Sequence, residues 1–241
     1  MRDYEDKVSI EVYKWQRKML KSPSTLNVLT VDAQNKLNSL YPEKYRELMC
    51  DTVTAMVQAV VGGVGYISCT PLVNISLEER DKEAKKVIEK YKRVGMVEGA
   101  STGMGGIFVG MMDFPLLISI KMKMLYELSA VYGYDTTTKR ERLYMLLIFQ
   151  LAFSNFEERG KLLKHLEKWE HYQRENSPHA NEFDWDKFQQ GYRDYLDIAK
   201  LMQLLPIIGA PVGAYTNQKL VGELGTVAIN VFHMRYIQHF K

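Results

Sequence analysis

A single carboxylate stands in an apolar part of the chain. Asp113 is the only charged residue of the segment 99–120, and Pro115 follows it closely. A carboxylate in apolar surroundings must form an ion pair, cap a helix or contact water. A structural role would be a cap on the helix that Pro115 begins, or an ion pair with Arg140 or Arg142. A functional role would be transfer of a proton or recognition of a ligand.

If the chain has a functional pocket, polar residues near its glycine-rich segments are the candidates to line it. The residues that we predict for such a pocket are Asp113, Asp135, Arg140 and Asn217.

The glycine cluster GASTGMGG at residues 99–106 raises the question of phosphate binding, because glycine-rich loops at helix starts expose amides to anions. The cluster lacks the Lys-Ser/Thr pair of a P-loop, and no strand precedes it as a dinucleotide fold requires. Close packing of helices therefore explains these glycines better than a nucleotide, and we predict no cofactor.

Metal chemistry has little support in the sequence. His165 and His171 are six positions apart and do not share a helix face, and no His-Glu-x-x-His or Cys-x-x-Cys motif occurs. No Gly-x-Ser-x-Gly elbow of a serine hydrolase is found. We therefore predict no metal site and assign no catalytic residue.

Composition limits the partners and the compartment. The chain of 241 residues has a formal net charge of only +3, which does not favour nucleic acid as a partner. Its first residues are charged and resemble neither a secretory signal nor a transit peptide. The two cysteines, Cys50 and Cys69, fit a reducing compartment and imply no disulfide framework. We expect a protein of the cytoplasm or of the cytoplasmic side of a membrane.

Small residues recur at helical spacing in two apolar segments. Such a stripe lets another backbone approach closely, or forms a groove that faces lipid. Because glycine costs about 1 kcal/mol relative to alanine in a helix, the stripe needs this compensation. The predicted packing glycines are Gly99, Gly103, Gly106, Gly110, Gly209 and Gly213.

The segments that contain these residues are all predicted to be helices. Residues 4–19 form an amphipathic stripe, which can either dock on a core or lie in a bilayer interface. A second helix should begin near Pro42 and lead into the uncharged run 52–77, a buried or membrane-dipping segment interrupted by glycines. Ser76 and Glu79 form a capping box for the next helix.

Further helices follow in the second half of the chain. A cap at Thr137 or Thr138 should begin one, whose apolar part 143–153 is either buried or embedded in a membrane. We expect a loop over 176–185, a helix over 186–205 and a last helix that ends near Arg235. Without any sustained alternating pattern, the fold class is an all-α, multi-helix bundle with glycine-faced apolar helices.

Several of these motifs, in this order, resemble the EcsC family. The C-terminal ones include Pro206-x-x-Gly209-Ala210-x-Val212-Gly213-Ala214, Asn217 and Arg235; the central ones are GxxxGxGG from Gly99, Asp113-x-Pro115, Tyr132-Gly133-Tyr134-Asp135, Arg140 and Arg142. The resemblance implies one EcsC-like helical domain over residues 1–241, with an amphipathic N-terminal region (1–42) and a signature-bearing core (95–235). The family's namesake is encoded beside the two components of an ABC transporter that affects protein secretion. The resemblance supplies no catalytic residues.

These observations leave different classes of function open. The first is a non-enzymatic protein at the cytoplasmic membrane, with the membrane surface or lipid as its partner, beside ABC transporter subunits. The second is a carrier of a lipid or small ligand, or an enzyme, with a pocket around Asp113. The third is a soluble scaffold whose glycines allow tight helix crossings.

Overall fold

The computed structural model describes residues 2–21, 43–63, 69–103, 114–154, 156–170 and 209–240. Within these residues all regular structure is helical, which confirms the predicted all-α bundle. The seven helices are α1 (Arg2–Met19), α3 (Glu43–Gly62), α4 (Leu77–Gly103), α6 (Phe114–Val131), α7 (Lys139–Phe153), α8 (Phe156–Glu167) and α12 (Gly209–Phe240).

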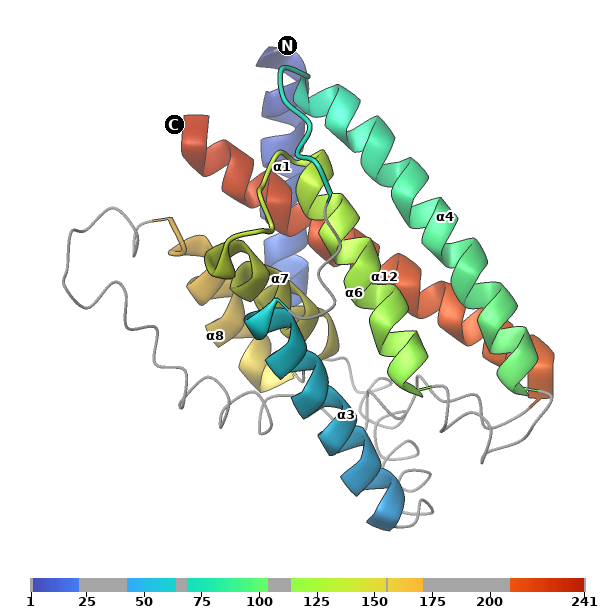
Figure 1. Cartoon of the computed structure of the whole chain (residues 1–241). Helices are drawn as coiled ribbons and strands as arrows, with labels where there is room; N and C mark the ends of the chain where they lie inside the picture. Colours follow the sequence, from blue (N-terminus) through green and yellow to red (C-terminus); the bar gives the residue numbers. More distant parts are fainter. Residues whose placement is uncertain are drawn as a thin grey trace.

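Two long helices, α4 and α12, run antiparallel and share the most extensive helix–helix contact (Figure 1). Glycine permits their close approach. A Cβ atom at Gly225 of α12 would lie 2.6 Å from Cδ1 of Ile88, and one at Gly95 of α4 would lie 3.3 Å from Cγ2 of Val221. Since an interior packs at close to crystal density, a methyl group at Gly225 would have to displace Ile88.

The predicted packing glycines belong partly to the same two helices. Gly99 and Gly103 lie in the C-terminal part of α4, and Gly209 and Gly213 lie in the first turns of α12. The segment with Gly106 and Gly110 lies outside the described residues.

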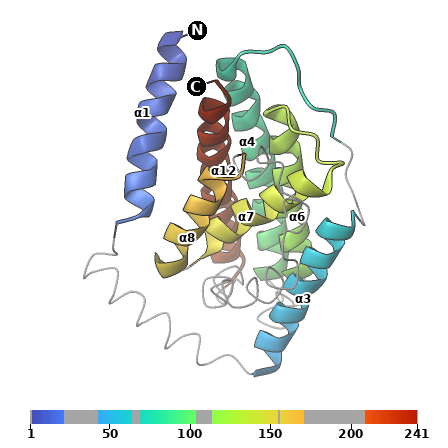
Figure 2. The ribbon, with the colours of Figure 1, turned by 90° about the vertical axis from the view of Figure 1, so that its left-hand side faces the viewer.

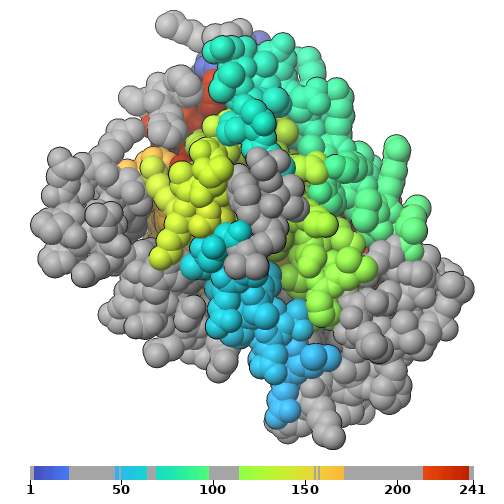
Figure 3. All heavy atoms as spheres, in the orientation of Figure 1, coloured from blue at the N-terminus to red at the C-terminus, as the bar shows by residue number. Residues whose placement is uncertain are grey.

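The core is centred on α6 and α7. Twelve of the fifteen residues of α7 are buried, which explains why this helix is apolar on nearly all sides. The apolar run 143–153 is thus enclosed by other helices of the chain. On the face shown in Figure 3, α3 and α4 cover much of the surface, and α6 and α7 show between them.

The amphipathic helices α1 and α3 lie on opposite sides of the bundle (Figure 2). α1 packs on α12 and α8 and buries Val8 and Val12. α3 packs on α7 and α6 and buries Val53, Val57 and Val60. The first helix therefore docks on the core by one face, which was one of its two predicted roles.

The helix starts and stops follow the local sequence. Ser76 and Glu79 form the predicted capping box, with the Ser76 amide donating to the Glu79 carboxylate over 2.8 Å and the Glu79 amide donating to Ser76 Oγ over 3.2 Å. Thr138 caps α7 by accepting the amide of Glu141. Gly133 ends α6 with a left-handed φ of 90°, and Tyr134 donates its amide back to the Ser129 carbonyl.

Two arginines fasten helix ends to neighbouring segments. Arg80 donates to the carbonyls of Leu72 and Val131, over 2.9 and 2.6 Å, and so holds the end of α6 against the chain that precedes α4. Arg142 donates to the Val61 carbonyl over 3.0 Å, near the end of α3.

Among the helices described, none combines the length and the hydropathy that crossing a bilayer requires.

Candidate functional site

Of the four predicted pocket residues, the structure describes Asp135, Arg140 and Asn217. Asp113 lies outside the described residues. Asp135 is exposed and accepts hydrogen bonds from the amide and hydroxyl of Thr137, over 2.9 and 2.7 Å. These bonds stabilise the charged form and lower the pKa of Asp135 below its ordinary value. Asp135 thus serves the turn that leads into α7.

Arg140 and Asn217 lie in different surroundings. Arg140 donates to a carboxylate oxygen of Glu170 over 2.7 Å. Asn217 is buried in α12, and its backbone carbonyl oxygen lies 3.7 Å from the position that a Cβ on Gly95 would take. The loop after α6 and the first turns of α12 lie at opposite ends of the bundle (Figure 1). Asp135 and Asn217 therefore do not line one pocket.

A buried polar network joins four segments of the chain. Asp81 of α4 accepts hydrogen bonds from the hydroxyls of Tyr4 and Tyr132, each over 2.6 Å. Nε2 of His233, from α12, lies 2.6 Å from the carboxylate oxygen that Tyr132 contacts. The network thus connects α1, α4, the end of α6 and α12.

Protonation states in this network follow from its contacts. Burial alone would raise the pKa of Asp81, but the hydrogen bond and charge of the His233 ring, with the two tyrosine hydroxyls, hold it below its ordinary value. Burial and the neighbouring Asp81 raise the pKa values of Tyr132 and Tyr4. The tyrosines therefore stay protonated and donate, and Asp81 stays ionised and accepts.

A second network surrounds Arg235 of α12. Its guanidinium forms a two-pronged ion pair with Glu141, over 2.6 and 2.7 Å, and donates to Glu170 over 2.6 Å. Its carbon Cζ lies 3.8 Å from the ring centre of Tyr134 and 4.4 Å from that of Tyr144. Carboxylates at the edge and aromatic rings on the faces satisfy both the charge and the planar shape of an arginine.

These networks resemble structural links more than reactive sites. Each connects helices that are distant in the sequence, and none of their members lines the groove described next. In the part of the chain that the structure describes, no cluster of His, Cys, Asp or Glu is suited to hold a metal ion. Cys50 and Cys69 are not joined by a disulfide.

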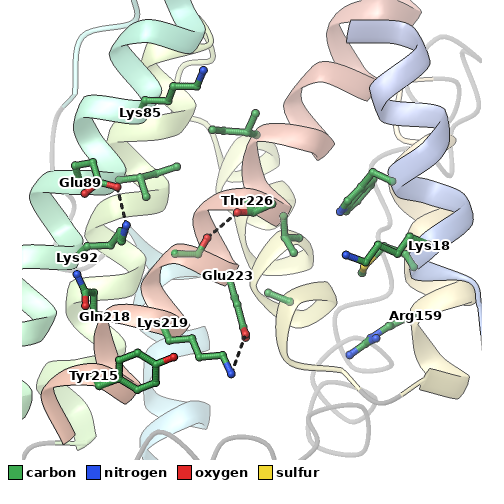
Figure 4. A pocket seen from close by; sticks show the side chains of 17 residues that line it. Lys18, Lys85, Glu89, Lys92, Arg159, Tyr215, Gln218, Lys219, Glu223 and Thr226 are labelled. Atoms are coloured by element: carbon green, nitrogen blue, oxygen red, sulfur yellow. Dashed lines mark hydrogen bonds and ion pairs between the residues drawn. The ribbon is translucent and has the colours of Figure 1, made fainter. Parts of the chain in front are cut away.

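A surface groove of about 1220 Å³ is the candidate ligand site within the part of the chain that the structure describes (Figure 4). α12 forms its floor, α4 forms one wall, and α1 with Arg159 of α8 forms the other. Its basic residues are Lys18, Lys85, Lys92, Arg159 and Lys219. Its acidic residues are Glu89 and Glu223. Its floor and sides include the apolar residues Trp15, Met19, Ile88, Ala152, Val227 and Ile229.

Sequence reasoning did not identify Asp81 and His233, or the groove. One signal for Asp81 is present, because it falls within the buried stripe Leu77, Ala84 and Ile88 of an otherwise charged helix. A carboxylate at such a position needs buried partners. The groove has no comparable signal, since its residues come from five helices and only folding brings them together.

Comparison with known proteins identifies the family. The EcsC protein family matches residues 6–237. Protein EcsC of Bacillus subtilis (strain 168) is 41% identical over 229 residues, covering 95% of this chain and 94% of the relative. Uncharacterized protein YdbA of the same organism is 23% identical over 248 residues, covering 94% and 90% respectively. No solved structure shows a significant match. The chain belongs to the EcsC protein family.

Proposed function

We propose that the chain is an accessory protein that binds the cytoplasmic surface of the membrane and assists an ABC transporter or protein secretion, without catalysing a reaction itself. The family resemblance supports the transporter context. The groove supports binding of a ligand, because basic and apolar side chains make up most of its lining.

The observation that carries the membrane proposal is the outer face of α1. Ile10 and Tyr13 point away from the core, with exposed fractions of 56% and 60%. Exposed basic residues, Lys14 and Arg17 among them, accompany these side chains on the same helix. Apolar and aromatic groups flanked by lysine and arginine are typical of a helix that lies in the interface of an anionic bilayer.

Flotation of the purified protein with liposomes tests this proposal. We expect the wild type to float with vesicles that contain phosphatidylglycerol, and the double variant Ile10→Ser/Tyr13→Ser to float much less at an unchanged melting temperature. Val73→Ser is the control, because Val73 is 68% exposed but belongs to the segment before α4 and not to α1. Recovery of wild-type protein wholly in the high-speed supernatant of cells, without flotation, would reject the proposal.

A second candidate is a carrier of a lipid or another small ligand, and the size of the groove with its apolar floor favours it. Such a carrier should retain its ligand through purification. Extraction of the purified protein followed by mass analysis of the extract would detect the ligand. For the version of this hypothesis centred on Asp113, we expect Asp113→Asn to abolish ligand binding without lowering the melting temperature.

A further inference from the structure

We infer that the groove between α1, α4 and α12 is a binding site for one anionic phospholipid, with the headgroup phosphate between the two walls and an acyl chain on the floor. This inference rests on the proposed membrane binding and specifies where on the protein a lipid is recognised.

The charge of the groove is the first argument. Its lining has five basic side chains and only two carboxylates, which leaves an excess of three positive charges. The whole chain has a formal net charge of +3, so the positive and negative residues outside the groove balance one another. The local excess at the groove is thus as large as the net charge of the whole chain, and it attracts an anion.

The pairing of these basic groups is the second argument. Lys92 lies 2.7 Å from Glu89 of its own helix, and Lys219 lies 4.0 Å from Glu223. The side chains of Lys18 and Lys85 make no ion pair or hydrogen bond within the part of the chain that the structure describes. They come from opposite walls, one from α1 and the other from α4 (Figure 4). An anion placed between the walls would have a cation on each side.

The floor is the third argument, because it suits an acyl chain better than a small anion. Ile88, Val227 and Ile229 give it aliphatic surface, and Trp15 adds an aromatic ring on the α1 side. Gly222 has no side chain to fill the floor of the groove, and the aliphatic carbons of Lys92 lie 3.8 Å from the position that a Cβ on Gly222 would take. Burial of a chain on such a surface adds affinity in proportion to the apolar area removed from water.

The location of the groove favours a membrane lipid over an acidic segment of another protein. The wall residues Trp15, Lys18 and Met19 belong to α1, the helix whose outer face carries the exposed Ile10 and Tyr13. The groove lies on the inner side of the same helix, so a protein bound to the bilayer through the outer face would hold the groove about one helix diameter, roughly 10 Å, from the headgroups. A lipid would have to move only about that distance from the bilayer to reach the groove.

The test measures binding to phosphatidylcholine vesicles with and without phosphatidylglycerol. The test variant is Lys18→Gln/Lys85→Gln, and the control is Lys7→Gln/Lys86→Gln, which removes the same charge from the same two helices outside the groove. We expect the test variant to lose roughly tenfold or more in affinity for phosphatidylglycerol vesicles, because each lysine near an anionic surface adds to the binding affinity. The control variant should lose clearly less affinity.

A second measurement reports on the floor. In a Trp185→Phe background, lipids brominated in their acyl chains should quench the tryptophan fluorescence of the vesicle-bound protein, and most of that quenching should vanish when Trp15→Phe is added. The other described tryptophan, Trp169, is only 3% exposed.

The outcomes separate this inference from the proposed function. Equal losses in the two lysine variants, or quenching unaffected by Trp15→Phe, would overturn the lipid site while membrane binding itself stands. If the wild type binds no vesicles, both fail. Binding of polyglutamate that requires Lys18 and Lys85, with unchanged vesicle binding in the variant, would assign the groove to a protein partner instead.

Discussion

Asp81 and His233 are separated by 152 positions in the sequence, yet Nε2 of the histidine lies 2.6 Å from a carboxylate oxygen of the aspartate. The pair joins the first turns of α4 to the last turns of α12, at exposed fractions of 4% and 6%. With the hydroxyls of Tyr4 and Tyr132 as further donors, it defines how these two helices are positioned along each other.

Replacement of Asp81 by asparagine should therefore destabilise the fold. The variant leaves buried donors without their charged acceptor, and loss of one partner of a buried pair costs about 3 kcal/mol or more. Chemical denaturation monitored by circular dichroism measures this. Tyr4→Phe removes one hydroxyl donor from the same carboxylate and should cost only about 1 kcal/mol. Equal effects of the two variants would contradict a central role for Asp81.

Acid should weaken the fold through the same carboxylate. The folded-state pKa of Asp81 lies below its ordinary value, so its ionised form stabilises the folded state at pH values above the unfolded-state pKa. That contribution is lost as the pH falls through the folded-state pKa, because the unfolded chain binds the proton first. Urea midpoints measured from neutral to acidic pH should fall less steeply for Asp81→Asn than for the wild type. If the urea midpoints of the two proteins fell in parallel with pH, Asp81 would not be the cause of the loss of stability in acid.

Arg235→Lys should also be destabilising, although it preserves the charge. A lysine cannot contact Glu141 through two nitrogens and Glu170 through a third, and it lacks the flat surface that lies against Tyr134 and Tyr144. We expect a loss of roughly 2 kcal/mol or more in the free energy of unfolding. The matched control is Lys219→Arg, which exchanges the ammonium and guanidinium groups in the opposite direction, at an exposed site of the same helix. A variant as stable as the wild type would refute the requirement for a guanidinium.

Gly225→Ala should cost roughly 1 to 3 kcal/mol because the new Cβ would meet Ile88 at 2.6 Å. At Gly222, one turn earlier in α12, the nearest atoms are Lys92 carbons at 3.8 Å, so Gly222→Ala is the control and should be neutral or stabilising. Thermal unfolding measures both. A second change, Ile88→Ala, should suppress part of the Gly225→Ala defect, and an additive double variant would argue against direct contact.

Local features of the fold were predictable from the sequence. The capping box at Ser76 and the cap at Thr138 depend on residues within a few positions, and each lies where predicted. Close approach of helices through small residues was predicted too. At Gly225, however, it depends on which side chain of α4 lies opposite, and spacing within one helix cannot show that.

The candidate sites were less predictable for the same reason. Asp135 and Arg140 lie near recognisable motifs, but Asp135 stabilises a turn and Arg140 forms an ion pair with Glu170. Lys18 and Lys85 look like ordinary solvated lysines on amphipathic helices. Only the packing of α1 and α4 on either side of α12 places them across one groove.

The contacts of α12 have a consequence for synthesis of the chain. Its last turns supply His233 and Arg235, and Tyr236 donates a hydrogen bond to Glu5 near the N-terminus over 3.3 Å. On a ribosome, the earlier helices emerge before α12, so Asp81, Glu141 and the inner side of α1 are without these partners until α12 follows. The bundle is therefore completed only when α12 has left the ribosome, and loss of its last turns would leave the earlier helices exposed to proteases and aggregation.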